Sequence, residues 1–248
     1  MKYASSIAKA TLALVAALGA VASVQATPVI GIANLTMGAV LVSPGEVDWN
    51  PPINSGPDAN PTYGGFTVSN ITNSGSFVSV SGTAGSVQDL SSNPGDGNFF
   101  PIGVSAGQPN FLLFSTQPFW LFRATRLEAG TIPGTPYVLT QVGTSTFASI
   151  AVSGTVCDGV SNLTCDAGED ITGFSIALSA QYTNSTIASL TATLAGPDGL
   201  FFTADDGSLS NNAWSGTVEA FRIPEPGTLG IAGAALLGMA LVGRRRKA

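Results

Sequence analysis

The sequence predicts an all-β fold for its central part, an antiparallel β-sandwich of the jelly-roll type. Three observations carry this prediction. Between residues 27 and 223, short runs rich in Val, Ile, Phe, Thr and Ser alternate apolar with small polar residues, which is the pattern of a half-buried strand. Gly, Asn, Asp and Pro separate most of the runs at fairly even spacing, as turns between strands do. Helical periodicity is hard to find there, so about ten strands in two packed sheets are expected.

The clearest strand covers residues 174–182, in which every second residue is apolar or aromatic and the others are Ser, Ala or Gln. Residues 214–220 alternate in a similar way, with Trp214 and Val218 on one face. Further strands are expected at residues 29–32, 66–70, 77–82, 111–115, 120–126, 137–142, 147–154 and 189–194. No convincing fixed-period repeat is visible, which makes a solenoid or propeller the poorer interpretation.

Two stretches are expected to be loops. Residues 91–97 have the composition of a plain connector, and residues 43–61 are rich in Pro and Asn, which forbid regular strand pairing. Trp49 is the large apolar residue of the longer loop. It has two interpretations, an exposed ring that stacks on a sugar or a buried ring that plugs the end of the sandwich, and we favour the buried ring.

Residues 1–26 have the organisation of a secretory signal peptide. Lys2 and Lys9 form a basic start, residues 10–22 are apolar, and a small-x-small cleavage site ends at Ala26. The apolar stretch is shorter than the about 20 residues that an ordinary spanning helix needs. We therefore expect export and removal of this segment, with a retained N-terminal anchor as the alternative.

The exported domain, residues 27–223, is strongly acidic. It contains three arginines, Arg123, Arg126 and Arg222, against fourteen carboxylates, a net charge of −11. Such a surface repels phosphate backbones, which excludes nucleic acid as an expected partner. It suits divalent cations or cationic polymers, and it keeps a surface rich in Ser, Thr and Asn soluble.

The chain contains no histidine. This removes Ser-His-Asp and Cys-His catalytic arrangements and His-ligated zinc, copper or iron sites. Carboxylate chemistry remains, but no two carboxylates are visibly paired as a glycosidase requires. We therefore expect a protein that is not an enzyme, with a His-free glycan-active enzyme as an alternative.

The two cysteines, Cys157 and Cys165, lie in the exported domain. Thiols are readily oxidised outside the cell, so we expect a disulfide that closes one short loop. On the chain-entropy model this loop contributes roughly 2–3 kcal/mol to stability.

Two acidic clusters invite a metal interpretation. Asp198, Asp205 and Asp206 lie in a Gly-rich stretch that loosely resembles the calcium loops of secreted bacterial proteins, since hard cations prefer oxygen ligands from tight loops. The alternative is a hairpin loop whose Asp side chains accept hydrogen bonds from turn amides. The second cluster, residues 166–170, is the weaker candidate. No cofactor is expected apart from this calcium hypothesis.

The C-terminal tail has three parts in a fixed order. Pro224, Glu225 and Pro226 disfavour helix and should stay extended. Residues 228–243 carry no charge and would form a helix of about 24 Å, marginal for a bilayer core of about 30 Å. The basic cluster that follows would hold the end on the cytoplasmic side. Its residues are Arg244, Arg245, Arg246 and Lys247.

This order, at the very end of the chain, resembles the PEP-CTERM sorting signal. The resemblance covers residues 224–248 and is independent of the fold of the preceding domain. It implies recognition by exosortase, a membrane protease and transpeptidase of Gram-negative bacteria, with transient anchoring in the inner membrane. It also implies delivery to the cell surface or beyond, and an association with exopolysaccharide and biofilm.

The sequence therefore predicts an exported surface or matrix protein with a structural or adhesive role. Its expected partners are the sorting protease, the membrane before processing and extracellular polysaccharide. The alternatives are a calcium-stabilised carbohydrate-binding module, the glycan-active enzyme and an uncleaved protein anchored by its C-terminus.

Overall fold

A computed structural model of the chain describes residues 27–49, 63–91, 100–102, 105–159, 165 and 170–223. The predicted signal peptide and the tail from Pro224 onward lie outside these residues. Long antiparallel strands make up most of the described chain and helices are few. The predicted all-β class is therefore confirmed.

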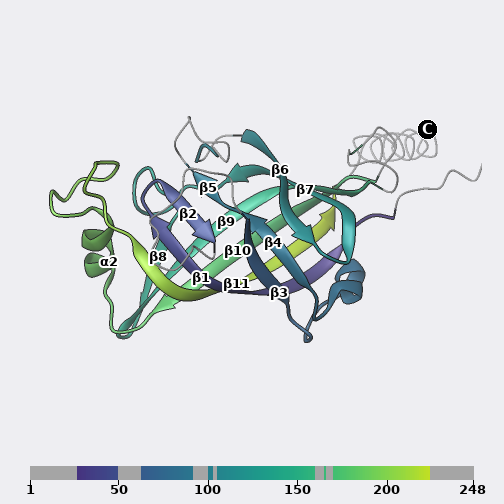
Figure 1. Ribbon diagram of the computed structural model, residues 1–248, viewed down its shortest axis with the longest axis horizontal. Helices are drawn as coiled ribbons and strands as arrows, with labels where there is room; N and C mark the ends of the chain where they lie inside the picture. The colour runs from purple at the N-terminus through teal and green to yellow at the C-terminus, as the bar shows by residue number, and fades with distance from the viewer. Residues whose placement is uncertain are drawn as a thin grey trace, which may run out of the picture.

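Eight of the strands form a closed antiparallel barrel (Figure 1). They are β1 (Gly31–Ser43), β3 (Tyr63–Val68), β4 (Ala84–Gln88), β6 (Ser105–Phe114), β7 (Gln117–Leu127), β9 (Ser145–Asp158), β10 (Thr172–Tyr182) and β11 (Leu209–Arg222). In this order, each strand pairs with the next one, and β11 pairs with β1 to complete the ring. The predicted two-sheet sandwich is wrong, because a sandwich keeps edge strands and this ring has closed on itself.

Closure depends on the pairing of the first and last strands of the barrel. The ladder runs from Gly31, opposite Ala220, to Val42, opposite Leu209. Its register shifts between Thr36 and Ala39 and again between Val40 and Val42. Such irregularities bend a strand and increase its twist, which lets β1 follow the curve of the barrel.

Three short strands extend the ring. β2 (Glu46–Trp49) pairs with β1, β5 (Leu90–Ser91) pairs with β2, and β8 (Val138–Val142) pairs with β9. The strand β2 lies inside the stretch that the sequence predicted as a loop, so that prediction is wrong for residues 46–49. The alternation of Glu46, Val47, Asp48 and Trp49 is too short to stand out beside the prolines that follow it.

Two predicted strands are helical. Residues 75–80 form the 3₁₀ helix η1 (Gly75–Val80), which buries Phe77 and Val80. Side chains three apart share a face in a 3₁₀ helix, whereas a strand would place this pair on opposite faces. The run expected at residues 189–194 is part of the α-helix α2 (Ile187–Leu194).

Residues 189–194 were wrongly predicted as a strand because the spacing of their apolar side chains fits both a helix and a strand. Leu190 and Leu194, the buried residues of α2, are four apart, a spacing that fits one helix face and also one strand face. The start of the helix settles the choice. Thr186 and Ser189 form a capping box in which each side chain accepts a hydrogen bond from the other residue's backbone N–H, which satisfies free amides of the first turn.

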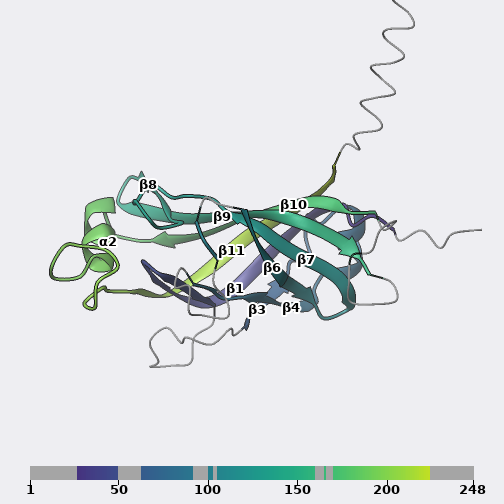
Figure 2. The ribbon, with the colours of Figure 1, turned by 90° about the horizontal axis from the view of Figure 1, so that it is seen from above.

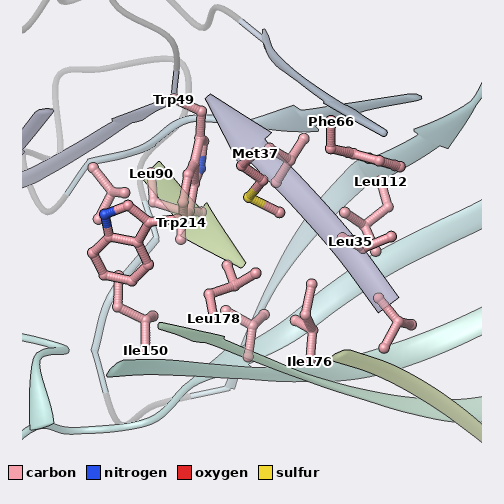
Figure 3. Packing of buried hydrophobic residues seen from close by; sticks show 14 of the residues in the cluster. Leu35, Met37, Trp49, Phe66, Leu90, Leu112, Ile150, Ile176, Leu178 and Trp214 are labelled. Atoms are coloured by element: carbon pink, nitrogen blue, oxygen red, sulfur yellow. The ribbon is translucent and has the colours of Figure 1, made fainter. Parts of the chain in front are cut away.

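The barrel interior is filled with apolar side chains. The alternation predicted for residues 174–182 is confirmed, since the even-numbered residues of β10 from Phe174 to Tyr182 are buried. Side chains from β1, β10 and β11 meet across the interior (Figure 3). An eight-stranded barrel is just wide enough for side chains to fill it, so this core is a packed interior.

The two ends of the described chain leave the barrel at the same end. Gly31 at the start of β1 lies opposite Ala220 near the end of β11. Helix α2 and the segment that follows it lie at the other end in both views (Figures 1 and 2). The barrel therefore has one end from which both terminal segments continue and one far end.

Candidate functional site

The end of the barrel that carries both termini is the candidate site, and we call it the exit rim. It is formed by the starts of β1, β7 and β10 and the ends of β9 and β11. Their ladders meet there, with Thr172 opposite both Arg222 and Val156, and Trp120 opposite Asp158. Whatever is attached at residue 26 or 224 must leave the domain from this rim.

The N-terminal strand is fixed close to the predicted cleavage site at Ala26. The buried Thr172 hydroxyl donates a hydrogen bond of 2.7 Å to the carbonyl oxygen of Val29. The backbone of Ile30 bonds to Ser76 in both directions, since its N–H donates to the Ser76 hydroxyl at 3.1 Å and its carbonyl accepts from the Ser76 N–H at 2.7 Å. The chain is therefore tied to the barrel within a few residues of the predicted cleavage site.

Two glycines allow η1 to lie directly against the start of β1. Gly31 has a φ of 128° and Gly75 a φ of 57°, a region that residues with a side chain rarely adopt. A Cβ on Gly31 would lie 2.1 Å from the Ser74 carbonyl oxygen, and one on Gly75 would lie 2.2 Å from the Ile30 carbonyl oxygen. Larger residues at either position would separate η1 from the rim.

A groove of about 470 Å³ opens at the exit rim. Its lining residues come from the N-terminal segment, η1 and the facing ends of β7 and β9: Thr27, Val29, Gly75, Ser76, Val78, Ser79, Gln117, Trp120 and Asp158. Trp120 is almost buried and packs edge-on against Phe77, with ring centroids 5.5 Å apart. The described lining offers hydroxyls, an amide and one carboxylate but no cationic side chain, which suits a neutral polar ligand.

Sequence analysis did not identify Gln117, Trp120 or Asp158 as site residues. They reach the groove because β7 and β9 pair at residues that are far apart in the chain, Trp120 and Asp158. No local motif marks them. The 3₁₀ helix that forms the facing wall was itself predicted as a strand, so the groove could not have been found from the sequence.

The predicted disulfide is confirmed. Cys157 near the end of β9 is bonded to Cys165, with a Cα–Cα distance of 5.9 Å. The bond lies at the exit rim because Cys157 pairs with Leu121 at the start of β7. It ties Cys165, which follows β9 in the chain, to the rim.

The acidic loop with Asp198, Asp205 and Asp206 lies beside α2 at the far end of the barrel, away from the exit rim (Figure 1). Its carboxylates accept local hydrogen bonds. The Asp198 carboxylate accepts from the Leu200 N–H at 2.8 Å, and that of Asp206 from the Phe202 N–H at 2.7 Å. These are the hydrogen bonds to turn amides that the alternative interpretation expected, although the loop joins α2 to β11 and is not a hairpin.

The carboxylate of Asp205, the third in the loop, also accepts hydrogen bonds. Asp205 accepts from the Thr203 hydroxyl at 2.8 Å and from the Asp198 N–H at 3.2 Å. The hydrogen bond from Thr203 is the main cause that lowers the pKa of Asp205 below its ordinary value. Across the described residues, no three His, Cys, Asp or Glu side chains are placed to hold a metal. In the other acidic cluster Asp170 is described, whereas Asp166 and Glu169 fall in the undescribed part.

Trp49 is a core residue. It is 2% exposed and packs edge-to-face on Trp214, with ring centroids 5.7 Å apart. Its backbone N–H donates a hydrogen bond of 2.8 Å to the buried carboxylate of Asp89. The interpretation as an exposed sugar-stacking ring is therefore wrong, and the favoured interpretation as a buried ring is confirmed.

The fold and the rim define an acidic β-barrel domain whose two termini continue from one end. Residues 222–247 match the family model described as the PEP-CTERM protein-sorting motif. The match begins at the last residue of β11, so the sorting motif follows the barrel without a linker. This motif implies sorting by exosortase and an extracellular or cell-surface destination.

The match covers the C-terminal tail and leaves the barrel without an assigned relative. No curated protein and no solved structure matches the chain. The predicted tail residues Pro224, Glu225, Pro226 and Arg244 to Lys247 lie outside the described part of the chain, as does Ala26. Within the described part, no helix is both long and apolar enough to cross a bilayer.

Proposed function

We propose that the chain is a structural or adhesive protein of the cell surface or extracellular matrix, held at the membrane by residues 228–243 until exosortase cuts near Pro224–Pro226. The observation that carries the proposal is the match to the sorting motif, which begins at Arg222, the last residue of β11. The closed barrel supports it, because a domain that has no edge in its ring resists non-specific strand pairing outside the cell.

The position of the motif supports cleavage at the exit rim. Arg222 is the last residue of β11 and Ile223, the next residue, is exposed. Pro224 and Pro226 disfavour helix in the segment that follows. A protease that works at the membrane surface would therefore find an extended substrate between the barrel and the uncharged segment.

The test is secretion in a host with and without exosortase. With the protease present, the protein is expected outside the cell, and without it the full-length chain is expected in the membrane fraction. The double variant Pro224→Ala with Pro226→Ala should remain in the membrane even with the protease. Thr228→Ala in the same tail is the matched control and should be sorted normally. Equal secretion with and without the protease would contradict the proposal.

We further propose that the extracellular partner is a polysaccharide and that the role is binding without catalysis. The groove at the exit rim supports this, because its described lining combines hydroxyls, an amide and one carboxylate with apolar side chains and no cation. Sugars are recognised by this combination of polar and apolar contacts. Pull-down with the exopolysaccharide of the producing cells should weaken for Gln117→Ala and not for Leu200→Ala at the far end. Equal binding by both variants would remove the groove from the proposal.

A further inference from the structure

The exit rim carries a set of large apolar side chains that the barrel core does not use. Phe119 is 45% exposed, Ile171 45%, Phe221 46% and Ile223 46%. They lie at three different strand ends, since Phe119 is near the start of β7, Ile171 precedes β10, Phe221 is near the end of β11 and Ile223 follows it. The ladder between β10 and β11 ends with Thr172 opposite Arg222, and Ile171 and Ile223 are the adjoining residues of the two segments.

These side chains lie on the outside of the strands. In β11 the inward residues are Trp214, Val218 and Ala220, so Phe221 points outward. Its ring lies across Gly173 of the neighbouring strand, where a Cβ would be 2.6 Å from the ring. Phe221 is therefore held in place on the outer surface, although nearly half of it is open to solvent.

The length of the chain that follows the exit rim limits how far the rim can lie from the membrane. Four residues, 224–227, separate Ile223 from the uncharged segment 228–243. A fully extended chain spans at most about 3.3–3.6 Å per residue, so this tether reaches about 14 Å. The headgroup layer alone is about 5–8 Å thick on each side of the hydrocarbon core. Even at full extension this leaves only about 6–9 Å between Ile223 and the outer edge of the headgroup layer, so the exit rim stays close to the bilayer.

The uncharged segment is itself short, which brings the exit rim still closer to the hydrocarbon core. Sixteen residues of helix cover about 24 Å, several ångströms less than the hydrocarbon core. A short span draws its flanking residues toward the membrane. Aromatic and aliphatic side chains at the domain end are then placed at the depth where the headgroups meet the acyl chains, which such side chains favour.

We propose that the exit rim rests on the surface of the bilayer while the chain is anchored, with Phe119, Ile171, Phe221 and Ile223 in contact with lipid. This inference rests on the proposed anchoring by residues 228–243 and adds an orientation to it. The far end, with α2 and the acidic loop, points away from the membrane. The net charge of −11 makes an uncharged lipid surface the better partner than an anionic one.

The test uses the chain after signal removal, residues 27–248, inserted by its own tail into phosphatidylcholine vesicles that contain a diazirine-labelled phosphatidylcholine. After photolysis, mass spectrometry locates the lipid adducts. We expect adducts at residues 119–121, 171–173 and 219–223 to exceed those at residues 198–206 several-fold. The far-end segment is the matched control because Leu200 is 60% and Phe202 51% exposed, so exposure alone would label them at least as strongly.

Variants separate lipid contact from general reactivity. Phe119→Ser combined with Ile171→Ser should lower the adducts at residues 219–223 several-fold, because the rim then loses apolar contact. Leu200→Ser at the far end should leave them unchanged. Both changes are at exposed positions, and circular dichroism of the purified variants checks that the barrel remains folded.

The labelling of the tail distinguishes a failure of the proposed anchoring from a failure of the proposed rim contact. Adducts on residues 228–243 together with equal labelling of the rim and the far end would overturn the rim contact and leave the anchoring intact. Absence of adducts on residues 228–243 would overturn the anchoring and the rim contact with it. Adducts on both the tail and the rim are the expected result.

Discussion

The hydroxyl of Tyr137 donates a hydrogen bond to the carbonyl oxygen of Ser43 at 2.7 Å, across a separation of 94 residues. The same hydroxyl also lies 3.0 Å from the carbonyl oxygen of Glu46. Tyr137 lies in the segment that precedes β8, and its hydroxyl thereby fixes the turn between β1 and β2. The contact links the starts of β2 and β8, two of the three short strands that extend the ring.

Removal of this hydroxyl should destabilise the barrel. Tyr137→Phe keeps the ring but removes the donor that the partly buried carbonyls of Ser43 and Glu46 share, so the free energy of unfolding should fall by about 0.5–1.5 kcal/mol. Tyr63→Phe is the control, because Tyr63 is 43% exposed and its hydroxyl can bond to water. Urea unfolding of both variants measures the difference. An equal loss in both would show that the Tyr137 hydrogen bonds contribute nothing specific.

Alkaline pH should unfold the protein through its buried tyrosines. Burial raises the pKa of Tyr137 well above 10.0 and that of Tyr182 to about 12. The Trp214 indole acts in the opposite direction and lowers the pKa of Tyr182, but burial is the larger cause. Since the folded pKa values are raised, their contribution to stability is complete below about pH 10 and is lost as the pH rises toward the folded values.

The measurement is urea unfolding as a function of pH, with tyrosinate absorbance recorded in parallel. We expect the unfolding free energy to decline above about pH 10, and less steeply in Tyr182→Phe after correction for the mutation itself. Tyrosinate absorbance that reaches its full value near pH 10 in the folded protein would disagree with this account.

Trp49 should be essential for the fold. Its ring is 2% exposed and packs on Trp214, so Trp49→Ala should lower the free energy of unfolding by about 3–5 kcal/mol. Leu200→Ala, at an exposed position of the far end, should change it by less than about 0.5 kcal/mol. Thermal and urea unfolding compare the two. A stable Trp49→Ala protein would contradict the packing.

The acidic loop should be stable without calcium. Backbone and hydroxyl donors already occupy the carboxylates of Asp198, Asp205 and Asp206, so EDTA should leave the melting temperature unchanged. Asp205→Ala should lower it at neutral pH. The pKa of Asp205 is depressed, so its contribution is present above its ordinary pKa and disappears as the pH falls through the folded value. A calcium-dependent rise in melting temperature would instead support the calcium hypothesis.

Local patterns predicted the parts of the fold that depend on nearest neighbours. The alternation of residues 174–182 predicted β10 and its buried face, because neither Pro nor Gly interrupts it. The spacing of Leu190 and Leu194 fits both a helix and a strand, and the Thr186–Ser189 cap that decides between them was overlooked. Phe77 and Val80 were placed in a strand because a 3₁₀ turn leaves almost no periodic signal.

Features that join distant residues could not be predicted. Closure requires residues 31–42 to meet residues 209–220, and nothing in either strand distinguishes a barrel partner from a sandwich neighbour. The groove draws on Ser76, Gln117 and Asp158 from separate elements. The sorting motif is different, because its parts are recognised in linear order and need no fold.

The fate of the C-terminal tail tests the proposed sorting and cleavage by exosortase most directly. Intact-mass analysis of the protein recovered from producing cells that contain exosortase measures this fate. We predict a mature chain that begins at Thr27 and ends near Pro224–Pro226, without the uncharged segment and the basic cluster. A mature protein that still carries Arg244 to Lys247 would contradict the account.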